Sequence, residues 1–361
     1  MKRIFFSLFV ASAVLLSSAV TCHEIDPDDP GEITFTYGAY FLNAGSEGKN
    51  DAELTQLNTM YGFVNGRAYS LSNDGATLGS GATDIYILED KMFVTLSASK
   101  QIKVLNKFTC TDVGTVTVTS EEGVTLTPLY MTAYEGALIV SFEEGYLARI
   151  DPATLQPTVV QEIAGTPRQI AMANQKLYVA IYREGDADGH SVNMFNPVAL
   201  HVMKTVEVLP RPTRLETDPA SGNLYVISEG NSETAAALQV IDSKDEEVTL
   251  IPGVVRPTLI SAGNKGAMLL YVQDGIDERP GRFMIFNTDT QKLEGEFIQD
   301  GSLVQSPCML SVDKNTNAVY IGCNPDSTFG IIHIYTSYGQ YLSSFYTGAP
   351  NPCGAVFVTG N

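Results

Sequence analysis

The sequence predicts an all-β fold, namely a seven-bladed β-propeller with four-stranded blades. Two recurring patterns lead to this prediction, and both have a spacing near 45 residues, which is the length of one propeller blade. The first is a proline that opens an apolar segment, and the second is an alternating segment that ends in Asn or Asp. The prolines are Pro128, Pro167, Pro212, Pro257, Pro307 and Pro352.

Each proline is expected at the first residue of a strand, because proline lacks the N–H that a position inside a sheet requires. A tight turn and a second apolar run follow. This second run carries an aromatic or branched residue in each copy. Its clearest copies are KLYVAI (176–181), NLYVIS (223–228), MLLYVQ (268–273) and AVYIGC (318–323).

The alternating segments give an independent count of the repeats. Alternation over five residues, closed by a turn former, predicts the next strand of each unit. The copies are LTQLN (54–58), IKVLN (102–106), LARID (147–151), VNMFN (192–196), LQVID (238–242), FMIFN (283–287) and the variant IHIYT (332–336). Seven copies predict seven blades.

The two ends of the repeat complement each other. The last proline segment, NPCGAVFV (351–358), has no chain after it to complete a blade, and the first unit, AYFLNA (39–44), has no proline strand before it. We therefore expect the C-terminal strand to be the innermost strand of the N-terminal blade, which closes the ring and leaves no open sheet edge.

Residues 1–21 have the pattern of a secretory signal peptide. Lys2 and Arg3 precede an apolar run over 4–16, and small residues lead to Cys22. The apolar run is too short to span a bilayer as a helix. A cysteine at this place resembles the lipid attachment site of bacterial lipoproteins, although Thr21 departs from the usual Gly, Ala or Ser. Ordinary secretion with cleavage nearby is the alternative.

Residues 22–32 are predicted to be an acidic lipoprotein tether, and residues 33–361 the propeller, as one domain. The tether segment holds five carboxylates and two prolines, so it has little to bury in a core. An acidic tract after the lipidated cysteine also resembles the export signal of some Gram-negative lipoproteins. It predicts an outer-membrane, lipid-anchored location that faces the cell exterior. A disordered linker in the periplasm is the alternative.

The charge balance excludes some classes of partner. The chain has 22 basic and 41 acidic residues, for a net charge of −19. Nucleic acid and anionic bilayers attract basic surfaces, so we expect no nucleic-acid partner, and membrane attachment through the lipid anchor only.

Cysteine is scarce in the predicted propeller, and three of its four cysteines lie near the C-terminus. An unbroken hairpin with Asp313 opposite Ala318 would place Cys308 opposite Cys323, so a disulfide between these two is one alternative. Cys353 occupies the repeat position equivalent to Cys308 and is a rival partner. Free, buried thiols are the third alternative.

A ligand site is predicted on the face that carries the loops into each innermost strand. The loops between the second and third strands lie on the same face, and several of them are long and polar. Four arginines stand next to the repeat prolines, namely Arg168, Arg211, Arg214 and Arg256. Their planar forks suit phosphate, carboxylate or amide oxygens. The alternative is that each pairs with an acidic neighbour such as Glu216, Glu229 or Asp274.

Other polar residues complete the predicted ligand-binding set. They are Tyr182, Arg183, Glu229, Asn231, Asp274, Asn324 and Asn351. No catalytic motif stands out, and the four histidines lack the spacing of metal ligands, so no catalytic or metal-binding residue and no cofactor is predicted.

Three segments resemble a known family. AYFLNAGSEGKNDAELTQLN (39–58), ATDIYILEDKMFVTLSASKQIKVLN (82–106) and TPRQIAMANQKLYVAIY (166–182) are similar to the YncE-like seven-bladed propeller lipoproteins of Gram-negative gut anaerobes. The BtuG-like members of that family capture cobalamin at the cell surface and pass it to a TonB-dependent outer-membrane transporter. The resemblance spans residues 33–361 and is carried by the architecture more than by the ligand-binding loops.

The resemblance implies a binding protein rather than an enzyme. Its expected ligand is cobalamin or a related corrinoid, and its expected partner is a TonB-dependent transporter. Two other classes remain as alternatives: a propeller that docks a glycan or a protein, which needs an aromatic platform such as Tyr130 with Tyr182, and a lactonase-like hydrolase, which needs a central metal ion.

Overall fold

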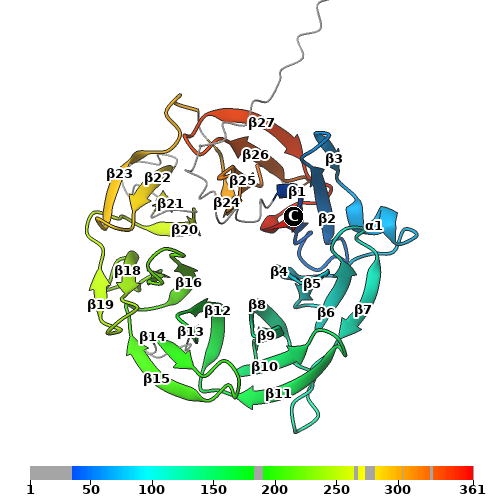
Figure 1. Cartoon of the computed structure of the whole chain (residues 1–361), viewed down its shortest axis with the longest axis horizontal. Helices are drawn as coiled ribbons and strands as arrows, with labels where there is room; N and C mark the ends of the chain where they lie inside the picture. Colours follow the sequence, from blue (N-terminus) through cyan, green and yellow to red (C-terminus); the bar gives the residue numbers. More distant parts are fainter. Residues whose placement is uncertain are drawn as a thin grey trace, which may run out of the picture. The chain divides into compact units, whose positions relative to one another are not determined.

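The computed structural model describes residues 35–182, 190–263, 267–272, 281–302, 304–325 and 328–360. Residues 35–360 form one compact unit. Within the described ranges, seven antiparallel sheets of four strands each stand around a central axis (Figure 1). The predicted seven-bladed β-propeller is confirmed.

We number the blades in chain order, beginning with the blade that contains the first described strand. Blade 1 consists of β28 (Pro352–Gly360), β1 (Phe35–Asn43), β2 (Glu53–Asn58) and β3 (Phe63–Asn65). Blade 2 consists of β4 (Ala82–Leu88), β5 (Lys91–Leu96), β6 (Gln101–Asn106) and β7 (Asp112–Val116). Blade 3 consists of β8 (Pro128–Tyr134), β9 (Ala137–Phe142), β10 (Tyr146–Asp151) and β11 (Gln156–Glu162).

The remaining blades follow the same plan. Blade 4 consists of β12 (Thr166–Ala173), β13 (Lys176–Tyr182), β14 (His190–Phe195) and β15 (Val202–Glu207). Blade 5 consists of β16 (Pro212–Thr217), β17 (Leu224–Ser228), β18 (Ala237–Ile241) and β19 (Val248–Leu250). Blade 6 consists of β20 (Pro257–Ala262), β21 (Ala267–Val272), β22 (Arg282–Asn287) and β23 (Lys292–Glu296). Blade 7 consists of β24 (Pro307–Val312), β25 (Val319–Cys323), β26 (Ile331–Tyr335) and β27 (Tyr341–Tyr346).

The ring closes as predicted. The innermost strand β28 comes from the C-terminus and pairs with β1, with Phe41 opposite Ala355. The proline pattern is also confirmed, because six innermost strands begin at or one residue before a repeat proline. In blade 2, Ala82 takes the place of that proline.

The hydrophobic core is divided among the contacts between neighbouring blades. Seven buried clusters are present in the described residues, one for each pair of adjacent blades. Between blades 7 and 1, the Phe41 ring lies 5.4 Å from that of Tyr320 and 5.5 Å from that of Phe345. Second strands such as β9 and β17 are buried along their whole length, which explains their continuous apolar runs.

Polar side chains also link the innermost strands of neighbouring blades. An oxygen of Asp84 accepts a hydrogen bond from the N–H of Met131 at 2.8 Å. In blade 4, Gln169 accepts a hydrogen bond from the N–H of Leu215 at 3.0 Å. In blade 5, Glu216 accepts one from the N–H of Ala262 at 3.1 Å. These bonds satisfy N–H groups that the innermost strands direct away from their own sheets.

All seven blades carry a β-bulge at the start of the innermost strand, where the register shifts by one residue. This bulge overturns the register expected for the cysteines. The turn does place Asp313 against Ala318, but Pro307 lies opposite Cys323, and Cys308 is the extra residue of the bulge. Cys308, Cys323, Cys353 and Cys110 are free thiols in the structure, with Cys110 and Cys323 buried and Cys308 and Cys353 partly buried.

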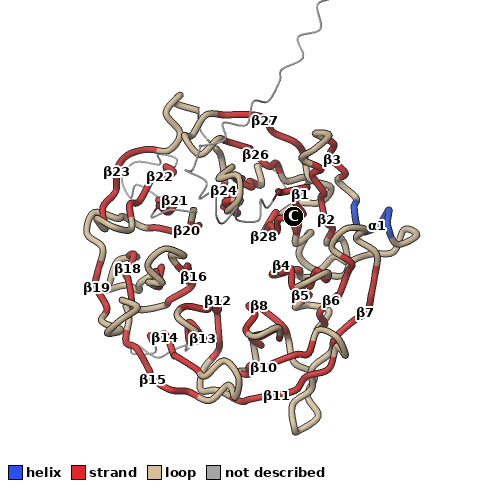
Figure 2. The backbone as a smooth tube through the Cα atoms, viewed as in Figure 1, coloured by secondary structure: helices blue, strands red, loops and turns tan. Residues whose placement is uncertain are grey.

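The sole helix of the described residues, α1 (Ala68–Ser72), lies beside blade 1 (Figure 2). The buried Glu53 carboxylate accepts hydrogen bonds from the N–H groups of Tyr69 and Ser70 at its start. Within the described ranges, this helix lacks the length and apolar character needed to cross a bilayer. The predicted signal peptide, Cys22 and the tether lie outside the described residues.

Candidate ligand-binding site on the mouth face

The two ends of the ring differ in which loops they carry. We call one end the mouth face. It bears the segments that lead into each innermost strand and the loops between the second and third strands. Backbone hydrogen bonds hold these two sets together: Glu229 N–H donates to Arg211 O at 2.9 Å, and Ala44 N–H donates to Asn351 O at 2.8 Å. We call the opposite end, with the tight hairpin turns, the turn face.

The residue before the repeat proline has an unusual backbone in four consecutive blades. Its φ is 58° at Arg211, 47° at Arg256, 49° at Ser306 and 61° at Asn351. The left-handed region is unfavourable for residues other than glycine, so the surrounding structure must hold these residues there. Such backbone strain often accompanies binding sites.

Three of the predicted site residues form a stacked group between blades 4 and 5. The guanidinium carbon of Arg168 lies 4.9 Å from the centre of the Tyr182 ring, and that of Arg211 lies 6.0 Å from it. Both distances are within the range of cation–π attraction. The structure thus brings two arginines to one aromatic ring at the mouth face.

Arg211 also has an acidic partner, which is one of the neighbours expected from the sequence. Its Nη2 lies 3.0 Å from Oε2 of Glu229, and the two side chains are 51% and 49% exposed. An ion pair so exposed contributes only about 0–1 kcal/mol. An anionic group of a ligand can therefore replace Glu229 at little cost. A second of the three expected acidic partners, Glu216, instead accepts a hydrogen bond from the N–H of Ala262, and burial raises its pKa.

A second group lies on the innermost strands of blades 2 to 5. Burial raises the pKa of Asp84 to about 7, opposed by the N–H groups of Met131 and Ile85 and by the charge of Arg214. Burial also raises the pKa of Tyr130. The charges of Arg214 and Arg168 lower this pKa, and the charge of Asp84 raises it. Asp84, Tyr130, Arg168 and Arg214 thus influence one another electrostatically, although they come from four different blades.

The sequence interpretation missed Asp84 as a member of this group. Asp84 stands two residues after Ala82, and Arg214 stands two residues after Pro212, so the two are equivalent repeat positions. Alignment of blade 2 with the other blades is the signal that could have found Asp84. The missing proline in blade 2 concealed it.

The predicted asparagines form hydrogen bonds within the propeller itself. Asn324 Nδ2 donates to Asn351 Oδ1 at 2.8 Å, and Asn351 Nδ2 donates to the carbonyl oxygen of Gly45 at 2.8 Å. These amides thus tie blade 7 to blade 1. Asn231 is exposed, and its Oδ1 accepts from the N–H groups of Glu233 and Thr234 within the loop after β17.

Arg256 is exposed just before the first strand of blade 6. Two other predicted site residues, Arg183 and Asp274, lie outside the described residues. In the part of the chain that the structure describes, no three side chains of His, Cys, Asp or Glu are placed to hold a metal ion.

The blades and their connections define the class of protein as a seven-bladed β-propeller. No protein-family model matches the sequence, and no curated protein matches it. Among solved structures, the chain is similar to hydrazine synthase from Kuenenia stuttgartiensis, with a TM-score of 0.59 and 14% identity. The likeness covers 74% of this chain and 87% of that one. At this identity the likeness shows the fold alone.

Proposed function

We propose that this protein is a cell-surface lipoprotein that captures a corrinoid such as cobalamin and delivers it to a TonB-dependent outer-membrane transporter. The observation that carries the binding role is the group of Arg168, Arg211 and Tyr182 at the mouth face. Arg214 extends the positive charge of this group toward the innermost strands. The choice of a corrinoid rests on the resemblance to the YncE-like lipoproteins.

The chemistry of cobalamin fits such a site. Cobalamin is large, is edged with amides and carries one phosphodiester. Arginine forks bind a phosphodiester through two parallel hydrogen bonds, and the exposed side chain of Asn231 can meet an amide group of the ligand. Because the ion pair of Arg211 with Glu229 is exposed, the phosphodiester can compete for that guanidinium.

Delivery requires binding without chemistry. A protein tethered at Cys22 raises the local concentration of a scarce ligand next to the transporter. Transfer follows when contacts between ligand and transporter compete with those at the mouth face. This role assigns no catalytic residue to the propeller.

Calorimetric titration of the chain from His23 onward tests the proposal. We expect cobalamin to bind at micromolar concentration or better. Cobinamide should bind more weakly, because it lacks the phosphodiester. Arg168→Ala and Arg211→Ala should each weaken cobalamin binding about tenfold or more, as expected for loss of a charge-assisted hydrogen bond.

Arg149→Ala is the matched control, because it also removes one arginine but from β10, where the side chain donates to the Pro197 carbonyl. It should leave the affinity unchanged. Absence of cobamide binding would refute the proposed ligand and leave the fold as it is. Binding to a glycan panel instead, with the same loss in Arg211→Ala, would assign the mouth face to a different ligand class.

A further inference from the structure

The exposed aromatic side chains of the propeller are confined to one part of the ring. Nine are exposed among the described residues, and all nine belong to three consecutive blades, 7, 1 and 2. They are Phe35, Tyr37, Tyr61, Phe63, Phe108, Phe329, Tyr338, Tyr341 and Tyr346. In the described parts of blades 3 to 6, the large exposed apolar side chains are aliphatic, such as Val198 and Met203.

The turn between the third and fourth strands allows a direct comparison, because it occupies the same place on the turn face of every blade. It carries Tyr61 in blade 1, Phe108 in blade 2 and Tyr338 in blade 7, which are 81%, 56% and 74% exposed. In blades 5 and 6 the same turns read SKDEE (243–247) and TDTQ (288–291). The repeat itself therefore does not require an aromatic residue there.

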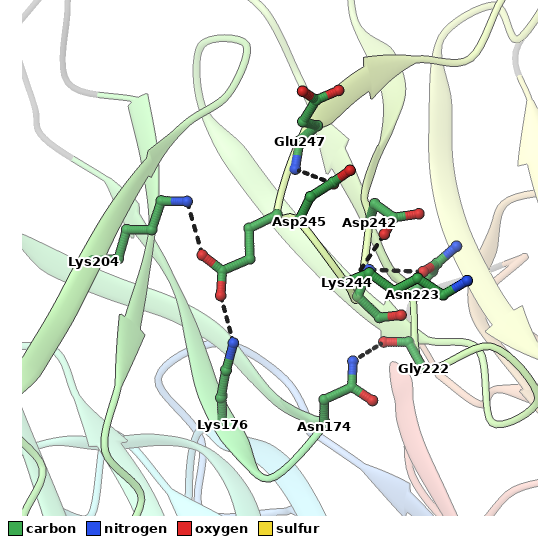
Figure 3. Close-up of polar contacts among 11 residues, drawn as sticks. Asn174, Lys176, Lys204, Gly222, Asn223, Asp242, Lys244, Asp245 and Glu247 are labelled. Carbon is green, nitrogen blue, oxygen red and sulfur yellow. Dashed lines mark hydrogen bonds and ion pairs between the residues drawn. The ribbon is translucent and has the colours of Figure 1, made fainter.

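The turn face of blades 4 and 5 has the opposite character (Figure 3). Glu246 forms ion pairs with Lys176 and with Lys204, the latter at 2.8 Å. Asn174 donates to the Gly222 carbonyl at 3.1 Å and joins the two blades. That side of the ring is charged, whereas the turns 59–62 and 336–340 contain no charged residue.

We propose that the turn face of blades 7, 1 and 2 contacts the lipid surface of the membrane. The contact residues form what we call the aromatic arc, namely Phe35, Tyr37, Met60, Tyr61, Phe63, Phe108, Tyr338 and Tyr341. This contact goes beyond the lipid anchor that the sequence predicts. It rests on the proposed lipid attachment at Cys22.

The position of Phe35 identifies the membrane as the occupant. Phe35 is the first described residue, belongs to the aromatic arc and is 57% exposed. Twelve residues, 23–34, separate it from Cys22. Even a fully extended segment of this length spans only about 40 Å, so a lipid on Cys22 keeps the aromatic arc close to the bilayer.

The residue types agree with a lipid interface. Tyrosine is favoured at the boundary between headgroups and acyl chains, where it keeps its hydroxyl in water, and phenylalanine is typical of the apolar face of segments that lie in this boundary. The turns 59–62 and 336–340 of the arc carry no charge, and Lys107, whose Nζ lies 5.0 Å from the centre of the Phe108 ring, adds a positive one. The arc can therefore approach a bilayer that the rest of this acidic chain, with an overall net charge of −19, avoids. With the turn face on the bilayer the mouth face points into solution for ligand capture, so delivery to the transporter requires the propeller to leave the lipid surface.

The chain contains no tryptophan, which allows a site-specific test. Tyr61→Trp in the chain from His23 onward places a single tryptophan in the aromatic arc. With vesicles of phosphatidylcholine brominated on the acyl chains, we expect its fluorescence to be quenched and shifted to the blue. Val198→Trp, in the equivalent turn of blade 4, is the control and should show neither change.

Phe63→Ser with Tyr338→Ser, in the Tyr61→Trp background, should lower the vesicle partition coefficient about tenfold. Val198→Ser with Val202→Ser removes exposed apolar side chains of blade 4 and should not lower it. The proposal is overturned if the tryptophan of the Tyr61→Trp variant is not quenched, or if that of the Val198→Trp variant is quenched equally. A blue shift without vesicles, together with a dimer mass, would assign the arc to contact between copies instead. Cobalamin binding is not needed in this assay, so the two proposals fail separately.

Discussion

Asp84 provides the sharpest test of the electrostatics inside the ring. Its pKa is raised from 3.8 to about 7, mainly by burial, so the folded protein retains a proton that the unfolded chain releases. Between about pH 4 and pH 7 the unfolded state therefore binds fewer protons, and stability must fall as the pH rises. Three pKa units at 1.36 kcal/mol each give an upper limit of about 4 kcal/mol.

The variant Asp84→Asn removes this titration and retains an oxygen that can accept from the Met131 N–H. Urea unfolding followed by circular dichroism at pH 5 and pH 8 measures the effect. We expect the variant to gain stability relative to the unmodified protein between pH 5 and pH 8 by up to about 3 kcal/mol, because only two of the three pKa units lie within this pH range.

Asp90→Asn is the control for this experiment. Asp90 is exposed, and its pKa is lowered by Lys91 through a side-chain hydrogen bond and the Lys91 charge. Removal of the Asp90 charge should leave the difference in unfolding free energy between pH 5 and pH 8 almost unchanged. If Asp84→Asn and the unmodified protein showed the same pH dependence, the assignment of a buried, proton-retaining carboxyl group would be wrong.

Two further predictions concern Arg211 and the cysteines. Arg211→Gly should be more stable to urea unfolding than Arg211→Ala by about 1 kcal/mol, because φ is 58° at this residue and glycine adopts that backbone without strain. Both variants should lose ligand affinity equally. Equal stability of the two variants would mean that the backbone is not strained. Burial raises the pKa of Cys110 and Cys308 to about 12 and that of Cys323 to about 11. The chain from His23 onward should therefore react slowly with Ellman's reagent when native and release four thiols in urea without reductant; two thiols would indicate a disulfide.

The repeat period was sufficient to predict the architecture. A proline that can only begin a strand and a terminal strand without a blade of its own together determine the number of blades and the closure of the ring. Both features are local in the sequence, and both follow from backbone hydrogen bonding. The pairing of β28 with β1 confirms this reasoning.

The register within each blade could not be predicted in the same way. A bulge adds one residue without an obvious mark in the sequence, and it moved Cys308 out of line with Cys323. The sequence also could not show which residues belong to the site, for a related reason. Asp84 and Arg214 act on each other across the ring, and periodicity within one blade does not reveal which side chains of distant blades meet.

The closure of the ring has a consequence for biosynthesis. Phe41 lies opposite Ala355, so the sheet that follows the proposed anchor stays incomplete until residues 352–360 have been made. Contacts so distant along the chain form late and slowly. A chain that stops before Pro352 would keep β1 as an open edge next to the anchored end, where pairing with a second chain is the main hazard.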